Sequence, residues 1–534
     1  MLHTQPAAAT RPAAAHVAGN GHYGGRGNGM LLQMEGITKI YGDVVANAGV
    51  DFTLEAGEVH ALVGENGAGK TTLMRILYGE EAPTSGTIRL RGKEQAFRSP
   101  EDAIRAGIGM VHQHFMLFPS FTVAENIVIG REPSSGILFD RKKAAEEVSR
   151  LSAEYGMPVD PHARVADCPV GVQQRVEILK VLYQGADIII LDEPSAVLTP
   201  LEVKELLSAI RGLARRGKSF ILITHKLQEV MDAADRITVL RDGRVTKTVR
   251  AADTNVDELS RLMVGRELVP FEKRPARPGE PVLEVEGLTI RAGRGKAKPL
   301  LDGVTFSVRA GEIVGVAGIS GNGQSELIQA VAGLRRIDAG TVRLCGRDVT
   351  GMDAGDIRRH GLAHIPEDRY MWGSAKEESV ADNAAMGHTD RLKRSGFLPG
   401  GRIRKLAESW IAAFGIKAES PNAKAGSLSG GNLQKLIAAR ELAHGSPLVI
   451  AAEPTRGVDI GAMEIIHGEL LKRRDEGGGI LLVSSELTEI LKLSDRIIVL
   501  SEGRIAGEFA AEEATEEEIS KLMTGVKADA AHAD

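Results

Sequence analysis

The sequence contains few cysteines and aromatic residues, no excess of one charge and no long apolar run. Only Cys168 and Cys345 occur among 534 residues, in no metal-ligand spacing, so a reducing compartment is expected. Asp and Glu (71) nearly balance Lys and Arg (66), and aromatic residues make up 4%, which argues against a general nucleic-acid-binding surface. No run approaches the roughly 18 apolar residues of a membrane-spanning helix. The remaining composition is typical of a globular protein of several domains.

The sequence contains one long internal repeat. Its landmarks return 254 residues later in the first part of the repeat and 260 residues later in the second part. The paired landmarks are Gly57 with Gly311, Gly64 with Gly318, Gly171 with Gly431, Glu193 with Glu453, and Gly243 with Gly503. An offset held over two long blocks predicts two copies of one domain, which we place at residues 30–268 and 281–526.

Three shorter segments complete the expected organisation. Residues 269–280 are rich in Pro, Arg and Lys and are predicted to be a linker. Residues 1–29 are rich in Ala, Gly, His and Arg but have no continuous apolar core, which favours a disordered tail over a secretory signal. Residues 527–534 are predicted to be a second disordered tail.

Each copy alternates apolar runs with helical patterns. Val59–Val63 is a predicted strand that leads into a glycine-rich loop, and apolar residues at helical spacing follow from Leu73 to Leu77. Ile188–Leu191 and Phe220–Ile223 are continuous apolar runs, typical of strands buried on both faces of a parallel sheet. The pattern predicts the α/β class, with helices on both faces of the sheet.

The first glycine-rich loop matches G-x-x-x-x-G-K-[ST] in full. Its residues are Gly64, Glu65, Asn66, Gly67, Ala68, Gly69, Lys70 and Thr71, with Thr72 directly after them. A strand, such a loop and a helix place backbone N–H groups around phosphates at the positive end of the helix dipole. Lys70 adds a charge between the outer phosphates, and Thr71 offers its hydroxyl to Mg2+. The loop therefore predicts a nucleotide site.

An acid pair directly follows the first of the two buried runs. Asp192 is predicted to hold Mg2+, and Glu193 to polarise the attacking water as a general base. Gln113 is predicted to contact both the metal and the water, and His225 to hydrogen-bond the terminal phosphate. Tyr41, 23 residues before the loop, is predicted to stack on the adenine ring, although an aromatic residue beside a strand also fits simple packing.

In this order, the loop, Gln113, the turn near Gly171, the acid pair and His225 resemble the ATP-binding cassette of ABC transporters. The resemblance covers nearly the whole chain, twice. Its finer form is to tandem-cassette subunits of bacterial importers for simple sugars and nucleosides, in the branch that depends on BMP-type lipoproteins. The segments that carry it are Gly171 with Gln173–Ile178, Ala196–Pro200, Ile365–Arg369 and Glu453–Asp459. Met110–Phe115 and Val176–Pro194 look most like the nucleoside branch.

The resemblance implies a motor subunit that hydrolyses ATP with Mg2+ and drives an importer, for nucleosides or alternatively for simple sugars. It implies that each P-loop NTPase copy has an α/β core, an antiparallel β subdomain and an α-helical subdomain. It also implies two transmembrane permease subunits, an extracellular or periplasmic solute-binding lipoprotein, no nucleic acid, and a peripheral position on the cytoplasmic face of the bacterial cell membrane. The two cassettes are expected to pair head to tail, with each ATP between the loop of one and the signature turn, usually L-S-G-G-Q, of the other.

The two copies depart from the family pattern in different places. The second copy has the near-ideal signature Leu428–Asn432, with Ser429, Gly430 and Gly431 at its centre, whereas the first has Pro169 in place of the serine. The second copy has instead lost most of its catalytic groups. The replacements are Gln324 for the lysine, Glu367 for the glutamine, Ala452 for the aspartate and Ser485 for the histidine, while Glu453 remains.

Head-to-tail pairing within the chain would unite the intact parts of both copies in one site. That site would join the first copy's loop and catalytic groups to Ser429–Gly431, and the other site would collect every defective part. Each lost charged hydrogen bond costs on the order of 1.5–3 kcal/mol, so two or three losses slow transfer by several powers of ten. We therefore expect one competent site and one degenerate site.

The segment His114–Asn126 is more apolar than a surface loop needs, with Phe115–Phe118 at its centre. It is expected either to dock on a permease or to pack inside the helical subdomain, and the sequence leaves both open.

Two other classes of cassette protein compete with an importer. A soluble tandem cassette that acts in translation usually carries a long charged linker and two intact sites, whereas this linker is short and one site is damaged. Cassette proteins of DNA repair or chromosomes need zinc cysteines or long coiled coils, and the sequence has neither.

Overall fold

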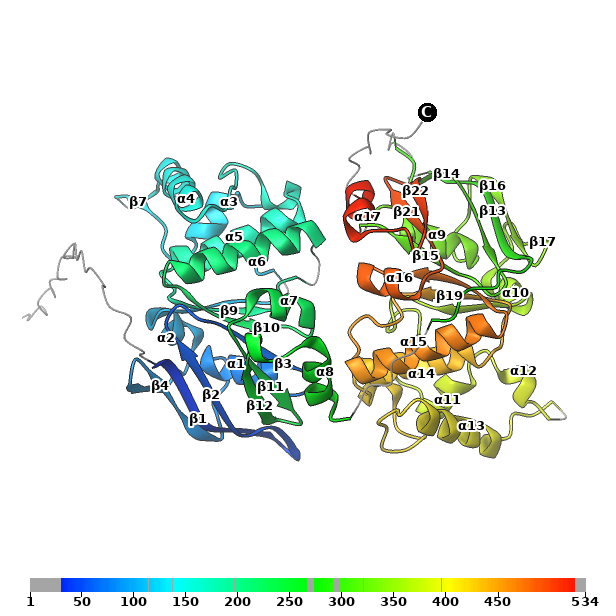
Figure 1. The fold of residues 1–534 in the computed structure, drawn as a ribbon, viewed down its shortest axis with the longest axis horizontal. Helices are drawn as coiled ribbons and strands as arrows, with labels where there is room; N and C mark the ends of the chain where they lie inside the picture. Colours follow the sequence, from blue (N-terminus) through cyan, green and yellow to red (C-terminus); the bar gives the residue numbers. More distant parts are fainter. Residues whose placement is uncertain are drawn as a thin grey trace, which may run out of the picture.

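Each half of the chain folds into a six-stranded sheet, a four-stranded sheet and a group of helices in this computed structural model (Figure 1). The structure describes residues 30–113, 115–136, 138–195, 198, 200–266, 273–291, 298–319, 321–394 and 396–523. The two predicted tails and part of the predicted linker lie outside these residues. Within them, no helix is both long enough and apolar enough to cross a membrane.

The six-stranded sheet of the first half carries the predicted buried strands. Its order is β12-β11-β3-β10-β9-β6, in which only the edge strand β12 is antiparallel to its neighbour. The strands are β3 (Val59–Gly64), β6 (Ile108–Val111), β9 (Ile188–Asp192), β10 (Ser219–Ile223), β11 (Arg236–Arg241) and β12 (Arg244–Arg250). Every residue of β3, β6, β9 and β10 is buried, so the prediction of a parallel sheet covered on both faces is confirmed.

An antiparallel sheet packs beside it across helix α1 (Lys70–Leu77). Its order is β2-β1-β4-β5, and its strands are β1 (Met30–Tyr41), β2 (Val44–Glu55), β4 (Ser85–Leu90) and β5 (Lys93–Gln95). Phe52 of β2, Leu73 of α1 and Leu62 of β3 belong to one buried cluster. The predicted helix after the loop is thus confirmed, and it joins the two sheets.

Most of the remaining helices of the first half are grouped above the six-stranded sheet in Figure 1, and the others lie beside its strands. The elements are α2 (Pro100–Arg105), α3 (Val123–Val128), the hairpin β7 (Ser134–Ser135) and β8 (Leu138–Phe139), α4 (Arg141–Tyr155), α5 (Val170–Tyr183), α6 (Pro200–Arg215), α7 (Leu227–Ala233) and α8 (Val256–Val264). Helices α3, α4 and α5 share a buried cluster with β9 and β10, so α5 is fixed against the sheet that ends in the acid pair.

The second half repeats this plan, as the internal repeat predicts. Its sheets have the orders β18-β19-β20-β15-β21-β22 and β14-β13-β16-β17. The strands are β13 (Pro281–Ile290), β14 (Leu301–Arg309), β15 (Ile313–Ala317), β16 (Ala339–Leu344), β17 (Arg347–Asp348), β18 (Leu362–Ile365), β19 (Leu448–Ala452), β20 (Gly479–Val483), β21 (Arg496–Ser501) and β22 (Arg504–Ala510). The helices are α9 (Gln324–Val331), α10 (Ala354–Arg359), α11 (Val380–Ala385), α12 (Thr389–Leu392), α13 (Gly400–Ala413), α14 (Gly430–Leu442), α15 (Ile460–Asp475), α16 (Leu487–Leu493) and α17 (Glu516–Met523).

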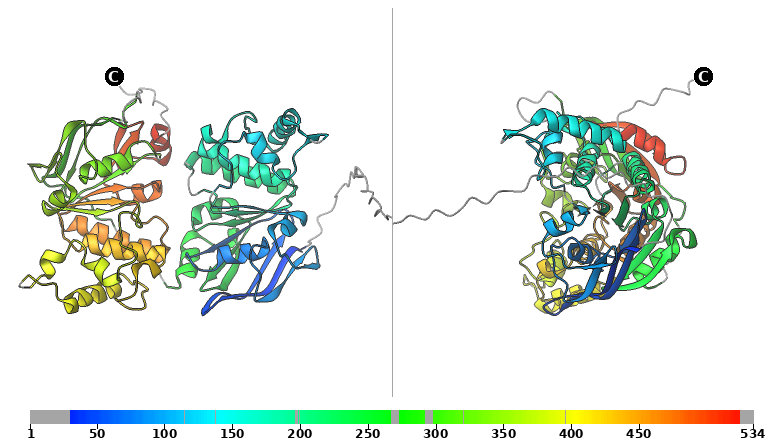
Figure 2. Two further views of the ribbon diagram at one scale, coloured as in Figure 1. Left: turned by 180° about the vertical axis from the view of Figure 1, so that it is seen from behind. Right: turned by 90° about the vertical axis from the view of Figure 1, so that its left-hand side faces the viewer.

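The two halves lie side by side with opposite ends adjacent (Figures 1 and 2). Helices α3 and α4 are level with the antiparallel sheet of the second half, whereas α11 and α13 are level with that of the first. Ion pairs between described residues join the halves, among them Lys226 with Glu486 at 3.1 Å and Arg266 with Glu464 at 2.7 Å. Ile460, at the start of α15, packs against an apolar cluster of the first half.

Candidate nucleotide site

The loop between β3 and α1 is held so tightly that two of its glycines have no room for a side chain. A Cβ on Gly64 would lie 2.3 Å from the carbonyl oxygen of Leu240, and one on Gly69 would lie 2.3 Å from that of Ala46. Gly69 also has a φ of 95°, which favours glycine. The loop therefore leads directly into the N-terminus of α1, where free backbone N–H groups can meet phosphate oxygens.

Lys70 lies buried over this loop. Its Nζ donates to the carbonyl oxygens of Gly64 at 2.7 Å and Glu65 at 3.0 Å. Burial lowers the pKa of Lys70, and the nearby carboxylates of Glu193 and Asp192 oppose that shift. The ammonium group thus lies on the loop, within the electrostatic influence of the two acids.

Asp192 lies at the buried end of β9 and faces the start of α1. The Thr71 hydroxyl donates to its Oδ2 at 3.3 Å. Burial and the charge of the adjacent Glu193 raise the pKa of Asp192, while the Thr71 hydrogen bond opposes the shift. In the described residues no group of three or more His, Cys, Asp or Glu side chains forms a metal site. One carboxylate and one hydroxyl nevertheless fit Mg2+, which usually takes few protein ligands beside phosphates and water.

Glu193 is held from two sides by the predicted catalytic partners. His225 Nδ1 lies 3.0 Å from Glu193 Oε1, and Gln113 Nε2 donates to Oε2 at 2.9 Å. Burial alone would raise the pKa of Glu193, but the hydrogen bond and charge of His225, with the charges of Lys70 and Lys226, outweigh burial and lower it. Glu193 is therefore ionised at neutral pH, in the form that can accept a proton from water.

Tyr41 is the predicted site residue with the least direct connection to the loop. It is exposed at the end of β1, where it pairs with Val44 of β2 and lies under Lys39 Nζ at 4.8 Å from the ring centroid. The same hairpin reaches the loop through Asn47, whose Nδ2 donates to the carbonyl oxygen of Gly69 at 3.1 Å. Its exposed ring is available for stacking, and Asn47 is a contact that sequence reasoning did not identify.

Side chains of the equivalent loop in the second half hydrogen-bond to the loop itself and to Glu367. Gln324 Nε2 donates to the carbonyl oxygen of Ile319 at 3.1 Å, and Ser325 Oγ donates to Glu367 Oε2 at 2.8 Å. Ala452 ends β19 without a carboxylate. Ser320 of this loop lies outside the described residues. The second loop therefore has neither the ammonium group nor the buried acid of the first.

Glu453 occupies the backbone position of Glu193 but has different neighbours. Ser485 donates to it twice, from its N–H to Oε1 at 2.7 Å and from its hydroxyl to Oε2 at 3.0 Å. Burial outweighs these hydrogen bonds and raises the pKa of Glu453 to about 7. At neutral pH this carboxyl is therefore about half protonated, whereas Glu193 is ionised.

The two signature turns differ as their sequences predict. Ser429 caps α14, and its Oγ accepts from the Asn432 N–H at 3.4 Å and side-chain amide at 2.8 Å. Pro169 caps α5 without a side-chain hydrogen bond, and the next residue, Val170, is exposed. Gly430 is half-buried and Gly431 buried. The Ala196–Pro200 segment is described only at Leu198 and Pro200.

Glu65 of the first loop contacts the second half of the chain. A Cβ on Gly461, at the start of α15, would lie 3.7 Å from Glu65 Oε1. Burial and the charge of Asp459 raise the pKa of Glu65, while Lys417 and Lys435 oppose the shift. Lys435 lies on the signature helix α14, and the Lys417 N–H donates to Asn432 Oδ1 at 2.9 Å. Sequence reasoning did not assign this contact, because it joins segments almost 400 positions apart.

The chain matches known proteins along both halves. The family model described as "ABC transporter" matches residues 48–196 and 301–456. The nucleoside import ATP-binding protein NupA of Lactococcus lactis subsp. cremoris is 47% identical over 502 residues, which cover 93% of this chain and 99% of that protein.

Two further relatives differ in the cargo that their names state. The guanosine import ATP-binding protein NupO of Bacillus subtilis is 48% identical over 498 residues, which cover 93% of this chain and 97% of that protein. A ribose import ATP-binding protein, RbsA 1 of Rubrobacter xylanophilus, is 44% identical over 496 residues, with coverages of 92% and 98%.

Proposed function

The chain belongs to the ABC transporter family, and from that premise we propose that it is the ATP-hydrolysing subunit of a nucleoside importer. The observation that carries the proposal is the Glu193 carboxylate, held between His225 and Gln113 at 3.0 and 2.9 Å. An ionised carboxylate in this position is suited to accept a proton from the water that attacks a phosphate. The named nucleoside and guanosine import relatives support the cargo class.

We propose that the first half supplies the catalytic groups for ATP. The loop Gly64–Thr72 would bind the phosphates, Tyr41 would stack on the adenine, and Lys70 would balance the outer phosphate charge. Mg2+ would be held by Thr71, Asp192 and Gln113, and when bound it supplies charge neutralisation at the β- and γ-phosphates. Glu193 would take the proton from water while His225 orients Glu193 and the terminal phosphate.

The competent site is completed, in this proposal, by Ser429–Gly431 of the second half, because the two cassettes pair head to tail within the chain. We place the cassettes at residues 30–268 and 281–526. The contacts of Glu65 with Gly461 and of Lys226 with Glu486 support this pairing, since both lie beside the first half's catalytic residues. The N-terminus of α14 would then direct its free N–H groups to the γ-phosphate.

The partners proposed are two transmembrane permease subunits and an extracellular or periplasmic solute-binding lipoprotein, with the chain on the cytoplasmic face of the membrane. The His114–Asn126 segment, whose first residue lies outside the described ones, supports a docking role only in part. Met116 and Phe118 are 57% and 52% exposed, whereas Leu117 packs against the buried core. Packing against the core is thus seen for Leu117, and we propose that the exposed Met116 and Phe118 dock on the permease.

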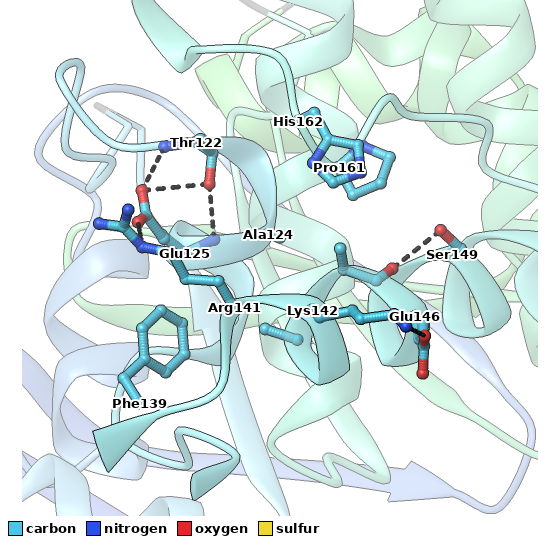
Figure 3. Close-up of a pocket in the computed structure, with 12 residues that line it drawn as sticks. Thr122, Ala124, Glu125, Phe139, Arg141, Lys142, Glu146, Ser149, Pro161 and His162 are labelled. Atoms are coloured by element: carbon cyan, nitrogen blue, oxygen red, sulfur yellow. Dashed lines mark hydrogen bonds and ion pairs between the residues drawn. The ribbon is translucent and has the colours of Figure 1, made fainter. Parts of the chain in front are cut away.

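A cleft beside this segment supports the same docking surface. It lies between the start of α3 and helix α4 and is lined by Thr122, Glu125, Phe139, Arg141, Glu146 and His162, among others (Figure 3). None of the predicted nucleotide-binding residues lines it. Its mixed charges and its apolar rim at Phe139 suit an amphipathic cytoplasmic segment of a permease. We expect the chain to copurify with its permeases from detergent extracts, and substitution of Met116 and Phe118 by Ser to reduce that recovery.

Uptake in cells tests the cargo. A strain that lacks this chain should lose uptake of labelled nucleosides and regain it with the wild-type chain but not with Glu193→Gln. Loss of ribose uptake with unchanged nucleoside uptake would favour the second candidate, a simple-sugar importer, which the 44% identical ribose relative supports. Copurification with ribosomes instead of permeases would favour the soluble translation class.

A further inference from the structure

The segment that follows β18 is longer than its counterpart in the first half. In both halves this segment ends on a buried asparagine whose Oδ1 accepts a backbone N–H, from Phe118 to Asn126 and from Ala375 to Asn383. Phe118 comes five residues after Gln113, whereas Ala375 comes eight residues after Glu367. The second half therefore contains three additional residues between these two landmarks.

This longer segment contains a compact turn that is held by hydrogen bonds within the turn. Asp368 Oδ1 accepts the N–H groups of Tyr370 at 2.8 Å and Met371 at 2.9 Å, and the Asp368 carbonyl accepts that of Trp372 at 3.1 Å. Met371 and Trp372 are 75% and 54% exposed. The turn Tyr370–Trp372 thus presents large apolar side chains to the surface on a backbone that its own hydrogen bonds fix.

Arg369, at the base of this turn, contacts the first residue of the signature helix α14. Its Nη1 donates to the carbonyl oxygen of Gly430 at 3.0 Å. Its Nη2 lies so close to Gly457 that a Cβ there would approach it to 2.7 Å. A Cβ on Gly430 would lie 3.3 Å from the Tyr370 hydroxyl. The guanidinium and the phenol therefore both lie against the start of α14.

The Tyr370 ring links this contact to the rest of the turn. Arg369 Cζ lies 5.6 Å from the ring centroid, and Lys376 Nζ lies 4.4 Å from it. A cation within about 6 Å of a ring centroid is attracted to the face of the ring. The exposed turn thus contacts, through Tyr370, the arginine that hydrogen-bonds Gly430.

In the first half, the shorter segment is hydrogen-bonded to the middle of helix α5 and not to its start. The Met116 N–H donates to Glu177, and Lys180 Nζ donates to the Met116 carbonyl oxygen at 2.9 Å. Glu177 and Lys180 lie in the second and third turns of α5, well after Pro169 and Val170. The arginine contact is thus found at the intact signature turn, while in the other half the described segment is anchored to the middle of the helix.

We propose that Arg369 is a positioning residue that holds the signature turn Ser429–Gly431 over the competent site and connects it to the exposed turn Tyr370–Trp372. This inference rests on the proposed function. The Gly430 carbonyl and the Gly431 N–H belong to one planar peptide unit, so a hydrogen bond that fixes the carbonyl also fixes the direction of the N–H. That N–H is one of the free donors at the N-terminus of α14 that a γ-phosphate would meet.

Steady-state ATP hydrolysis by the purified full chain tests the proposal. We expect Arg369→Ala to lower kcat about 10-fold and to change KM for ATP less than about twofold, since an N–H misaligned only in the closed state affects turnover more than binding. Arg404→Ala, which removes an exposed arginine from α13 of the same half, should leave kcat unchanged. Equal kcat values for the two variants would overturn the proposal.

A double-mutant cycle separates local positioning from general damage to the fold. If Arg369 acts through the signature turn, Arg369→Ala should lower kcat less than about threefold in a chain that already carries Ser429→Ala. If the double variant lowers kcat by the product of the two single-variant factors, the proposal is overturned. If Arg369→Ala lowers the melting temperature, Arg369→Lys tests the proposal instead. Lysine keeps the positive charge but lacks the paired N–H donors of the guanidinium group. We expect about a threefold lower kcat for it, and a wild-type kcat at wild-type stability would contradict the proposal.

The same assay distinguishes failure of this inference from failure of the proposed function. If Glu193→Gln leaves ATP hydrolysis unchanged, the proposed function fails. If Glu193→Gln abolishes hydrolysis while Arg369→Ala behaves like Arg404→Ala, only the role of Arg369 fails.

Discussion

Glu193 and Glu453 occupy the same backbone position in the two halves and have opposite electrostatics. Both have a φ of 47°, a conformation that costs a non-glycine residue about 1 kcal/mol or more. Both donate their N–H to the neighbouring strand, to Ile223 at 2.8 Å and to Val483 at 2.7 Å. Yet the pKa of Glu193 is lowered by His225 and nearby lysines against the effect of burial, whereas burial raises that of Glu453 to about 7.

The comparison teaches that the backbone frame alone does not make a catalytic site. The second half keeps the strand, the strained turn and the carboxyl, but its loop carries Gln324 and its strand ends in Ala452. The charges around the carboxyl decide whether it is ionised and whether it has a phosphate and metal to act on.

The largest expected effect is on turnover. We expect Glu193→Gln to lower kcat for ATP hydrolysis by at least about 100-fold while ATP binding persists, because the substitution removes the general base and leaves the phosphate-binding loop intact. Glu453→Gln, the matched variant in the other half, should change kcat less than about twofold. Equal losses in the two variants, measured by phosphate release, would break the asymmetry.

The signature turns should differ next. Ser429→Ala removes a hydroxyl that would bond the γ-phosphate, and we expect kcat to fall about 10-fold. Pro169→Ser restores a serine to the turn that would serve the degenerate site, and kcat should stay within about twofold of wild type. A gain in kcat from Pro169→Ser would show that the second site was limited by its signature alone.

The remaining expected effect is on stability and not on turnover, and its sign should differ between the two carboxyls. The folded-state pKa of Glu453 (about 7) exceeds the unfolded value of about 4.3. The stabilisation of the folded state that comes from this raised pKa is therefore complete below pH 4.3 and is lost as the pH rises through 7. The free energy of unfolding of wild type relative to Glu453→Gln should therefore fall by about 3–4 kcal/mol between about pH 4 and pH 8.

Glu193 provides the opposite control for this measurement. Because its folded-state pKa is lowered, its contribution is present above pH 4.3 and is lost as the pH falls below that value. Denaturant unfolding of wild type, Glu193→Gln and Glu453→Gln at several pH values measures both trends. If the free energy of unfolding relative to wild type changes with pH in the same direction for both variants, the electrostatic difference between the halves is contradicted.

Much of the fold and the local part of the site could be predicted from the sequence. Continuous apolar runs predicted β3, β9 and β10, and the glycine pattern predicted the loop and α1, because these features depend on neighbouring residues. The residues Thr71, Gln113, Asp192, Glu193 and His225 come together in the structure because parallel strands end at one edge of the sheet.

The contacts between distant segments could not be predicted. The link from Arg369 to Gly430 joins residues 61 positions apart, and the link from Glu65 to Gly461 depends on how the halves meet. The mixed exposure of Met116, Leu117 and Phe118 has the same origin, since an apolar run does not state which residues face the core.

Trapping of a hydrolysed nucleotide tests the central claim most directly. The purified chain would be incubated with Mg2+, orthovanadate and a photoreactive azido-ATP, irradiated, and digested to locate the labelled peptides. One competent site on the first half's loop predicts vanadate-dependent label in peptides of residues 30–268. Equal vanadate-dependent label in peptides of residues 281–526 would contradict the account.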